Sequence, residues 1–155
     1  MILSLVYIAA VCVANYSVHL FGPSVTPVNA FLFIGLDFVI RDKLHESVGI
    51  VRMLGLIAVA GLISYTLNPA TSMIAIASVA AFALSSVCDA AVYQALIRKP
   101  WPVKSNGSNI AASMVDSLVF PLIAFGVLMP HIVIGQFLAK VCGGAVWSYV
   151  LRNYR

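Results

Sequence analysis

Long apolar stretches separated by short breaks are the feature that most constrains this chain. Six such stretches follow one another from residue 2 to residue 151, and each approaches the roughly 20 residues that a helix needs to cross a bilayer. Only 9% of the 155 residues are charged, whereas soluble domains carry about 25% charged residues. A water-soluble fold is therefore excluded, and the breaks are too short to hold a catalytic domain outside the membrane.

The sequence predicts one polytopic, all-α transmembrane domain over residues 1–155. The predicted transmembrane helices cover residues 2–20, 26–44, 50–67, 71–97, 108–129 and 131–151. The breaks between them contain Gly22-Pro23 with Pro27, residues 47–49, Asn68-Pro69, residues 100–107, and Pro130. The first stretch has no basic residues before it and no small-residue cleavage site after it, so we expect a retained helix and not a signal peptide.

Positively charged residues lie at alternate breaks. They are Arg41, Lys43 and Arg52 around the second break, Arg98, Lys99 and Lys104 in the fourth, and Arg152 and Arg155 at the C-terminus. The first, third and fifth breaks contain no Lys or Arg. The positive-inside rule therefore predicts both termini in the cytoplasm, which requires an even number of helices. Six helices can form two halves of three helices each, which then have opposite orientations in the membrane, as in an inverted repeat. An acid on the second helix of each half, Asp37 and Asp116, is a weak indication of such a repeat.

Four charged residues lie well inside the predicted helices. Asp37, Asp89 and Asp116 fall in the cytoplasmic half, and Lys140 falls near the middle of the last helix. An ionised side chain at this depth costs about 2.5–3.5 kcal/mol or more, so such residues are usually paired or functional. Lys140 is too far from either helix end to reach an interface, and it needs a buried anion that any of the three carboxylates can supply.

Other polar residues share helix faces with these charges. The predicted polar faces carry Asn15 and His19, Ser85 and Asp89, Asn109, Ser113 and Asp116, and Gln136, Lys140 and Gly144. Asp37 precedes Arg41 by four residues, the favourable order for a helical ion pair. We therefore expect a polar cavity inside the bundle, with Phe31 among the aromatic side chains that line it. Small residues recur every fourth position at Gly135, Ala139 and Gly143, and at Ala10 and Ala14, which permits close helix packing.

Each polar group also has a structural interpretation. Asp37 and Arg41 can anchor a helix end at the cytoplasmic surface or take part in gating or binding. Lys140 with Asp116 or Asp89 can be a structural pair, although buried pairs seldom add net stability, which favours function. Asn15 can bond across helices or contact a ligand. His19 is near an outer interface, where packing or solvation is favoured over proton relay.

Several functions are excluded by what the sequence lacks. There is no nucleotide-binding loop, nucleophile elbow or metalloprotease motif, so we expect no enzyme, no cofactor and no metal site. Cys12, Cys88 and Cys142 lie in apolar stretches without ligand spacing and are predicted to be packing residues. The net charge of +4 reflects orientation in a membrane, so nucleic acid is not an expected partner and membrane lipid is.

Segments spread in order along nearly the whole chain resemble the family of putative vitamin uptake transporters, which includes the queuosine precursor transporters. The segments are NYSV at residues 15–18, NAFLFIGLDFVIR at 29–41, AFALSSVCD at 81–89, SMVDSLVF at 113–120 with IAF at 123–125, and Lys140. The resemblance implies a six-helix protein of the bacterial inner membrane. It also implies import of cyano-deazaguanine, aminomethyl-deazaguanine or a similar purine-like heterocycle.

The resemblance also implies roles for individual residues. A guanine-like ring offers adjacent N–H groups to a carboxylate, accepts hydrogen bonds at its carbonyl, and stacks on aromatic side chains. The expected substrate-binding residues are Asp116 as the first candidate carboxylate, Asp89 as the second, Lys140, Asn15, Ser113, Gln136 and Phe31. Asp37 and Arg41 match the family's acid and base as a gate or ion pair. Ser113 stands where the related transporters carry Asn, which changes the hydrogen bonding expected there.

Two other functions stay open at this stage. The chain can be a substrate-binding subunit, similar to the S components of ECF-type vitamin importers, that docks an energising partner through a small-residue face such as Ala10 and Ala14. It can also be a structural or assembly protein without cargo. The sequence leaves open homo-oligomerisation and the choice between proton coupling and facilitated diffusion.

Overall fold

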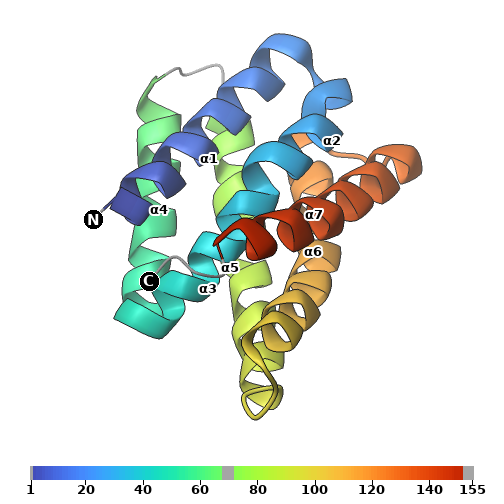
Figure 1. The fold of residues 1–155 in the computed structure, drawn as a ribbon. Coiled ribbons are helices and arrows are strands. Elements are labelled where there is room, and N and C mark those ends of the chain that lie inside the picture. Colours follow the sequence, from blue (N-terminus) through green and yellow to red (C-terminus); the bar gives the residue numbers. More distant parts are fainter. Residues whose placement is uncertain (1, 68–71, 152–155) are drawn as a thin grey trace.

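A computed structural model describes residues 2–67 and 72–151, and this part of the chain is helical throughout, with short connections and no strand (Figure 1). The elements are α1 (Ile2–Phe21), the 3-10 turn η1 (Pro23–Val25), α2 (Thr26–Asn29), the π-helical segment η2 (Ala30–Ile34), α3 (Gly35–Val48), α4 (Ile50–Leu67), α5 (Ser72–Ala95), α6 (Trp101–Phe125) and α7 (Pro130–Leu151). Because α2, η2 and α3 follow one another without a gap, they form one long helix.

The predicted six-helix membrane architecture is confirmed. Within the described residues, five helices are long and apolar enough to cross a membrane, and they lie at Leu3–Phe21, Pro23–Leu44, Ser72–Ala95, Trp101–Phe125 and Pro130–Leu151. The sixth is α4, which contains the shorter apolar segment Leu54–Thr66. The predicted break at Asn68-Pro69 lies outside the described residues.

Two of the predicted breaks are wrong. Pro27 lies inside α2, and the predicted break at residues 100–107 forms the first turns of α6. Both helices carry proline in the first turn, where the missing N–H has no helical partner to lose. Gly107 is a packing residue, since a Cβ there would lie 2.7 Å from Leu96 Cδ1. At the other end, α6 stops at Phe125 because Gly126 adopts φ +70°, four residues before the predicted end at Met129.

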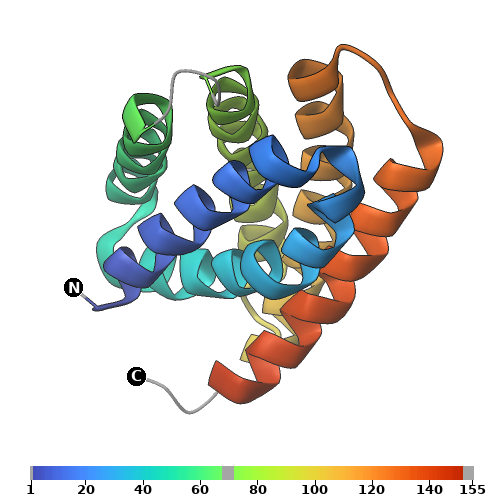
Figure 2. The same cartoon turned by 90° about the horizontal axis from the view of Figure 1, so that it is seen from above.

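The helices surround a shared interior. In Figures 1 and 2, α5 and α6 form an antiparallel hairpin, α7 crosses α6, and α4 lies at one edge beside α1 and α5. Tyr7, Phe38 and Phe82 belong to the apolar core between them. Ala10 and Ala14 are 7% and 5% exposed, so they face this interior. The prediction that they form a docking face is therefore wrong.

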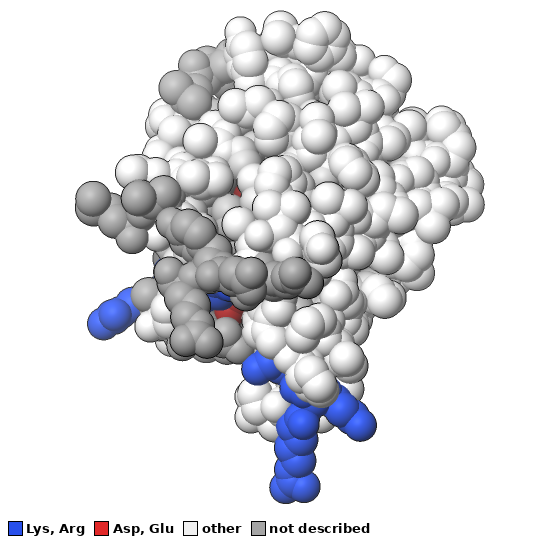
Figure 3. All heavy atoms as spheres, viewed as in Figure 1, with Lys and Arg blue, Asp and Glu red and all other residues white. Residues whose placement is uncertain are grey.

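On the face that Figure 3 shows, the exposed Lys and Arg side chains lie toward one end of the molecule. Figure 3 shows Lys and Arg atoms gathered at the lower end of the view, where the α5–α6 hairpin turns, and the exposed Arg98 and Lys99 belong to that turn. The upper half of this face is almost free of Lys and Arg. The positive-inside rule predicts that this end faces the cytoplasm. This orientation and the inverted repeat of the two halves both stay predictions.

A glycine contact holds the long helix formed by α2, η2 and α3 against α7. A Cβ on Gly35 would lie 2.7 Å from the backbone carbon of Gly143, and a Cβ on Gly143 would collide with the carbonyl oxygen of Phe31. Gly135 faces Pro27 about two turns of α7 away from Gly143, at 3.3 Å for an added Cβ. The predicted small-residue face of α7 is thus the surface on which the long helix packs.

Gly143→Ala is expected to destabilise the protein by about 1–3 kcal/mol, because the added methyl group meets rigid backbone and not a movable side chain. Gly55→Ala is the matched control, since a Cβ at Gly55 meets nothing within 4 Å and alanine favours the helix. Thermal unfolding in detergent measures both. Equal melting temperatures for the two variants would contradict the close contact.

Candidate functional site

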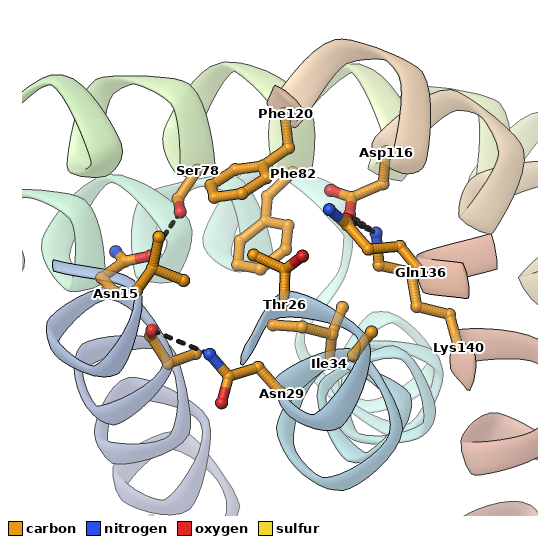
Figure 4. Close-up of a pocket in the computed structure, with 13 residues that line it drawn as sticks. Asn15, Thr26, Asn29, Ile34, Ser78, Phe82, Asp116, Phe120, Gln136 and Lys140 are labelled. Carbon is orange, nitrogen blue, oxygen red and sulfur yellow. Dashed lines mark hydrogen bonds and ion pairs between the residues drawn. The ribbon is translucent and has the colours of Figure 1, made fainter. Parts of the chain in front are cut away.

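A small cavity lies between α1, the long helix of α2, η2 and α3, α5, α6 and α7 (Figure 4). Its volume is about 30 Å³. The cavity is lined by Ala14, Asn15, Val18, Thr26, Asn29, Ala30, Ile34, Ser78, Phe82, Asp116, Phe120, Gln136 and Lys140. Four of the residues expected to bind substrate are therefore together here: Asn15, Asp116, Gln136 and Lys140.

One wall of the cavity is a charged cluster on α6 and α7. The Lys140 ammonium lies 2.6 Å from Asp116 Oδ2, and it donates to Gln136 Oε1 at 2.9 Å and to Ser117 Oγ at 3.0 Å. These three contacts match the three hydrogens of the ammonium. Of the three carboxylates considered from the sequence, Asp116 is therefore the partner of Lys140.

Local helix geometry positions this wall. Asp116 and Ser117 are adjacent on α6, and Gln136 and Lys140 are one turn apart on α7. Pro121 lies inside α6 and has no N–H to donate to the carbonyl of Ser117, four residues earlier. The backbone of α6 is thus interrupted beside the residue that accepts from Lys140.

Two polar atoms of the charged wall have no partner among the described residues. They are Asp116 Oδ1 and Gln136 Nε2, and both side chains are about 2% exposed. Leaving a buried polar atom unpaired costs about 1–3 kcal/mol. The wall thus presents a carboxylate acceptor and an amide donor that are available to a bound molecule.

The opposite wall carries amide side chains from α1 and α2. Ser78 donates to Asn15 Oδ1 at 2.5 Å, while Asn15 Nδ2 donates to Ser64 at 3.2 Å. Asn29 Nδ2 donates to Ser17 Oγ at 2.7 Å and to the carbonyl of Ala14 at 3.2 Å. Asn15 therefore bonds across helices, the structural role considered from the sequence, and it also lines the cavity. Asn29 was not among the predicted binding residues, although a polar side chain in an apolar helix indicates an inward-facing position.

Aromatic rings separate the two walls. Figure 4 shows Phe82 and Phe120 between the amide side and the Asp116–Lys140 side. Phe31 does not line the cavity, since it is 37% exposed and its backbone carbonyl faces Gly143. Phe31 lies in the π-helical segment of residues 30–34, and its role in binding stays a prediction that the lining of this cavity does not support.

Two other expected residues also lie outside the cavity lining. Ser113 is fully buried, and its hydroxyl has no partner among the described residues. Asp89 is 2% exposed, and it is not among the residues that line the cavity. The carboxylate of this cavity is therefore Asp116 and not Asp89.

Arg41 and Asp37 do not form the predicted ion pair by direct contact. Arg41 Nη1 donates to Ser86 Oγ at 2.6 Å, to Ser85 Oγ at 3.1 Å and to the Phe82 carbonyl at 3.3 Å, all on α5. Its guanidinium also lies 4.2 Å from the ring centre of Phe38. Neither Asp37 oxygen has a hydrogen-bond partner among the described residues. Both residues are 1% exposed, so the alternative of a surface anchor is wrong too.

The cavity combines polar side chains with a small volume. Within residues 2–67 and 72–151, no group of three His, Cys, Asp or Glu side chains could hold a metal. Known ligand pockets measure about 300–1,000 Å³, whereas this cavity measures about 30 Å³. A bicyclic molecule therefore fits only if the surrounding helices move apart.

Comparison with protein families gives one match. The family described as Putative vitamin uptake transporter matches residues 2–151, which is nearly the whole chain. Comparison with curated proteins and with solved structures gives no match. With its apolar helices and its buried polar cavity, this multi-pass membrane protein therefore belongs to the family of putative vitamin uptake transporters.

Proposed function

We propose that this protein imports a queuosine precursor, cyano-deazaguanine or aminomethyl-deazaguanine, or a similar purine-like heterocycle, across the bacterial inner membrane. The observation that carries the proposal is the unpaired acceptor and donor in the cavity, Asp116 Oδ1 and Gln136 Nε2. Both belong to residues whose other polar atoms bond to Lys140.

The edge of a deazaguanine ring complements these two atoms. Its ring N–H and exocyclic amine donate, so a carboxylate such as Asp116 accepts from them. Its carbonyl oxygen accepts, so the Gln136 amide donates to it. The rings of Phe82 and Phe120, which line the same cavity, offer apolar surfaces to the flat faces of the ligand.

The position of the cavity supports transport by alternating access. The cavity lies inside the bundle, and helices from both halves of the chain line it. Binding sites between two halves of a membrane bundle are typical of transporters that open alternately to each side. The small volume fits a state in which the helices close around the site.

The alternative of a binding subunit that needs an energising partner keeps its argument from size and helix number. Ala10 and Ala14, the candidate docking face, do not support it, because both are buried inside the bundle. We therefore propose a transporter that works alone as the function to test first.

Purified protein in liposomes, with no other protein present, is the direct test. We expect uptake of radiolabelled cyano-deazaguanine that saturates with concentration and is inhibited by unlabelled guanine-like rings. Adenine, which lacks the carbonyl and the N–H of the six-membered ring, should compete at least about 10-fold less well, because mismatched buried polar groups are costly. Absence of uptake by correctly inserted protein would contradict an autonomous importer, and equal competition by adenine would contradict the assigned edge recognition.

A further inference from the structure

A polar face of α6 continues beyond the cavity. Ser105, Asn109, Ser113 and Asp116 follow one another at spacings of four, four and three residues, so their side chains lie on one face of the helix. Each of the four is at most 2% exposed. Asp116 lines the cavity, whereas Ser105 lies about 16 Å away along the helix axis, at about 1.5 Å per residue. Because α6 begins next to the basic turn between α5 and α6, this α6 polar face leads from the cavity toward the predicted cytoplasmic side.

Two side chains outside the cavity leave polar atoms of this face without partners in the described part of the chain. Asn109 Oδ1 and Ser113 Oγ have no hydrogen-bond partner there, as is the case for Asp116 Oδ1. Asn109 Nδ2 bonds within its own helix, to Ser105 Oγ at 3.5 Å. Buried Asn and Ser side chains that serve helix packing in membranes bond from one helix to another. Among the described residues these two do not, so their polar atoms are available to a molecule that passes along the face.

Side chains of α3 cover the predicted cytoplasmic end of the α6 polar face. The Ser105 hydroxyl donates to Asp42 Oδ2, and the Lys43 ammonium lies 4.8 Å from the ring centre of Trp101 in the first turn of α6. The hydroxyl, carboxyl and ammonium groups in these contacts can bind water instead when the helices separate. The contact between α3 and α6 at this end is thus suited to opening and closing, unlike an interlocked apolar core.

The long helix also covers the middle of the face, at a glycine of α7. An added Cβ at Gly144 would lie 3.7 Å from Asn109 Nδ2, and an added Cβ at Gly35 would lie 2.8 Å from Gly144 N. The helices α3, α6 and α7 therefore meet beside Asn109. Ile34, which lines the cavity, directly precedes Gly35. Movement of the long helix away from α7 would therefore open the cavity and the α6 polar face together.

We propose that the α6 polar face is the route by which the cargo leaves the cavity for the cytoplasm, and that Asn109 is a second binding position on that route. The Asn109 amide offers an acceptor and a donor side by side, as Asp116 Oδ1 and Gln136 Nε2 do in the cavity. It therefore suits the same edge of a neutral, purine-like ring. The hydrogen bond between Ser105 and Asp42 closes the route in the state that the structure describes. This inference rests on the proposed function for the identity of the cargo, whereas the opening of the face to water does not depend on it.

Cysteine labelling tests the route without any cargo. Asn109→Cys and Ser113→Cys place a thiol on the face, while Ile110→Cys and Met114→Cys place one at neighbouring positions that are 48% and 45% exposed on the outer surface of α6. A charged, membrane-impermeant methanethiosulfonate reagent is added to the cytoplasmic side in inverted vesicles. We expect the two buried positions to react at least about tenfold faster than the two outer ones, because a charged reagent enters a water-filled route and is excluded from hydrocarbon.

The background for all four variants replaces the native cysteines: Cys12→Ala, Cys88→Ala and Cys142→Ala. Ser113→Cys is nearly isosteric with the wild-type side chain, so it keeps the test decisive if Asn109→Cys does not fold. Equal rates at the buried and outer positions, or labelling of the buried positions from the outer side only, would overturn the route.

Uptake by Asn109 variants tests whether the cargo binds at this position. Asn109→Leu keeps the approximate size of the side chain and removes both polar atoms, so the maximal rate of uptake should fall by about tenfold, the factor that corresponds to one hydrogen bond. Equilibrium binding of radiolabelled cyano-deazaguanine should stay close to wild type, since Asn109 does not line the cavity. Asn109→Ser is smaller but polar, and its rate should fall less.

If Asn109→Leu transported at least as well as Asn109→Ser, the size of the side chain and not its polarity would matter, and the second binding position would be overturned. No uptake by wild type would contradict the proposed function, and the labelling rates would still decide whether the face opens to the cytoplasm.

Discussion

Asp116→Asn is expected to lower the uptake of cyano-deazaguanine at low concentration by about 10–100-fold, because charge-assisted hydrogen bonds contribute about 1.5–3 kcal/mol. The variant keeps the size of the side chain but removes the negative charge that faces Lys140 at 2.6 Å. It also replaces the free acceptor Asp116 Oδ1 with a group that is neutral. Initial rates in liposomes, corrected for the amount of inserted protein, measure the loss.

The same substitution should destabilise the protein. It leaves the Lys140 ammonium buried, at 1% exposed, without an anion, and breaking a buried ion pair costs about 3–5 kcal/mol. The double variant Asp116→Asn with Lys140→Met should recover most of that stability, because no unpaired charge remains. It should not recover uptake. A double variant that transports like wild type would show that the pair is structural.

Ser117→Ala is the matched control for this series. It removes one acceptor of Lys140 at 3.0 Å and leaves the pair with Asp116 intact. We expect a loss of about 1 kcal/mol in stability and a small change in uptake. If Ser117→Ala impaired uptake as much as Asp116→Asn, general damage to the α6–α7 contact would explain both.

The fold was largely predictable from sequence because the membrane sets helix length. Apolar stretches of about 20 residues define spans, and five of the six predicted helices begin within one residue of a described helix start. The two wrong breaks arise at prolines, which break a helix only beyond its first turn. Sequence alone does not distinguish a proline that precedes a helix from one, such as Pro102, that lies in its first turn.

The candidate site was predictable in part because polar faces on apolar helices point inward. The spacing of Gln136 and Lys140 placed both on one face of α7, and the structure brings that face to Asp116. Helical spacing does not decide which of the three carboxylates lies opposite Lys140, because that depends on how the helices cross. The partner of Lys140 is therefore set by tertiary packing.

Arg41 shows why the inner residues were harder to predict. The predicted helix ends at Leu44, so Arg41 was placed near a helix end. The helix α3 instead continues to Val48, and the side chains of Arg41 and its neighbour Asp42 are buried. More polar side chains are therefore buried between α3 and α5 than the sequence pattern predicts. A cation near the end of an apolar stretch is not evidence of exposure when the helix extends beyond it.

Arg41→Met is expected to have a large effect, because Arg41 contacts Phe82, which lines the cavity. It keeps much of the side-chain length but removes the donor that joins α3 to Ser86, Ser85 and the Phe82 carbonyl on α5. We expect a loss of about 2–4 kcal/mol in stability, since hydrogen bonds to charged groups contribute about 1.5–3 kcal/mol and buried partners are left unpaired. Because Phe82 lines the cavity, cargo binding should weaken as well, measured as a raised KM for uptake.

Arg52→Met on α4 is the control, because that arginine is exposed and exposed substitutions usually change stability by less than about 0.5 kcal/mol. Equal melting temperatures for the Arg41 and Arg52 variants would show that the guanidinium does not hold α3 against α5.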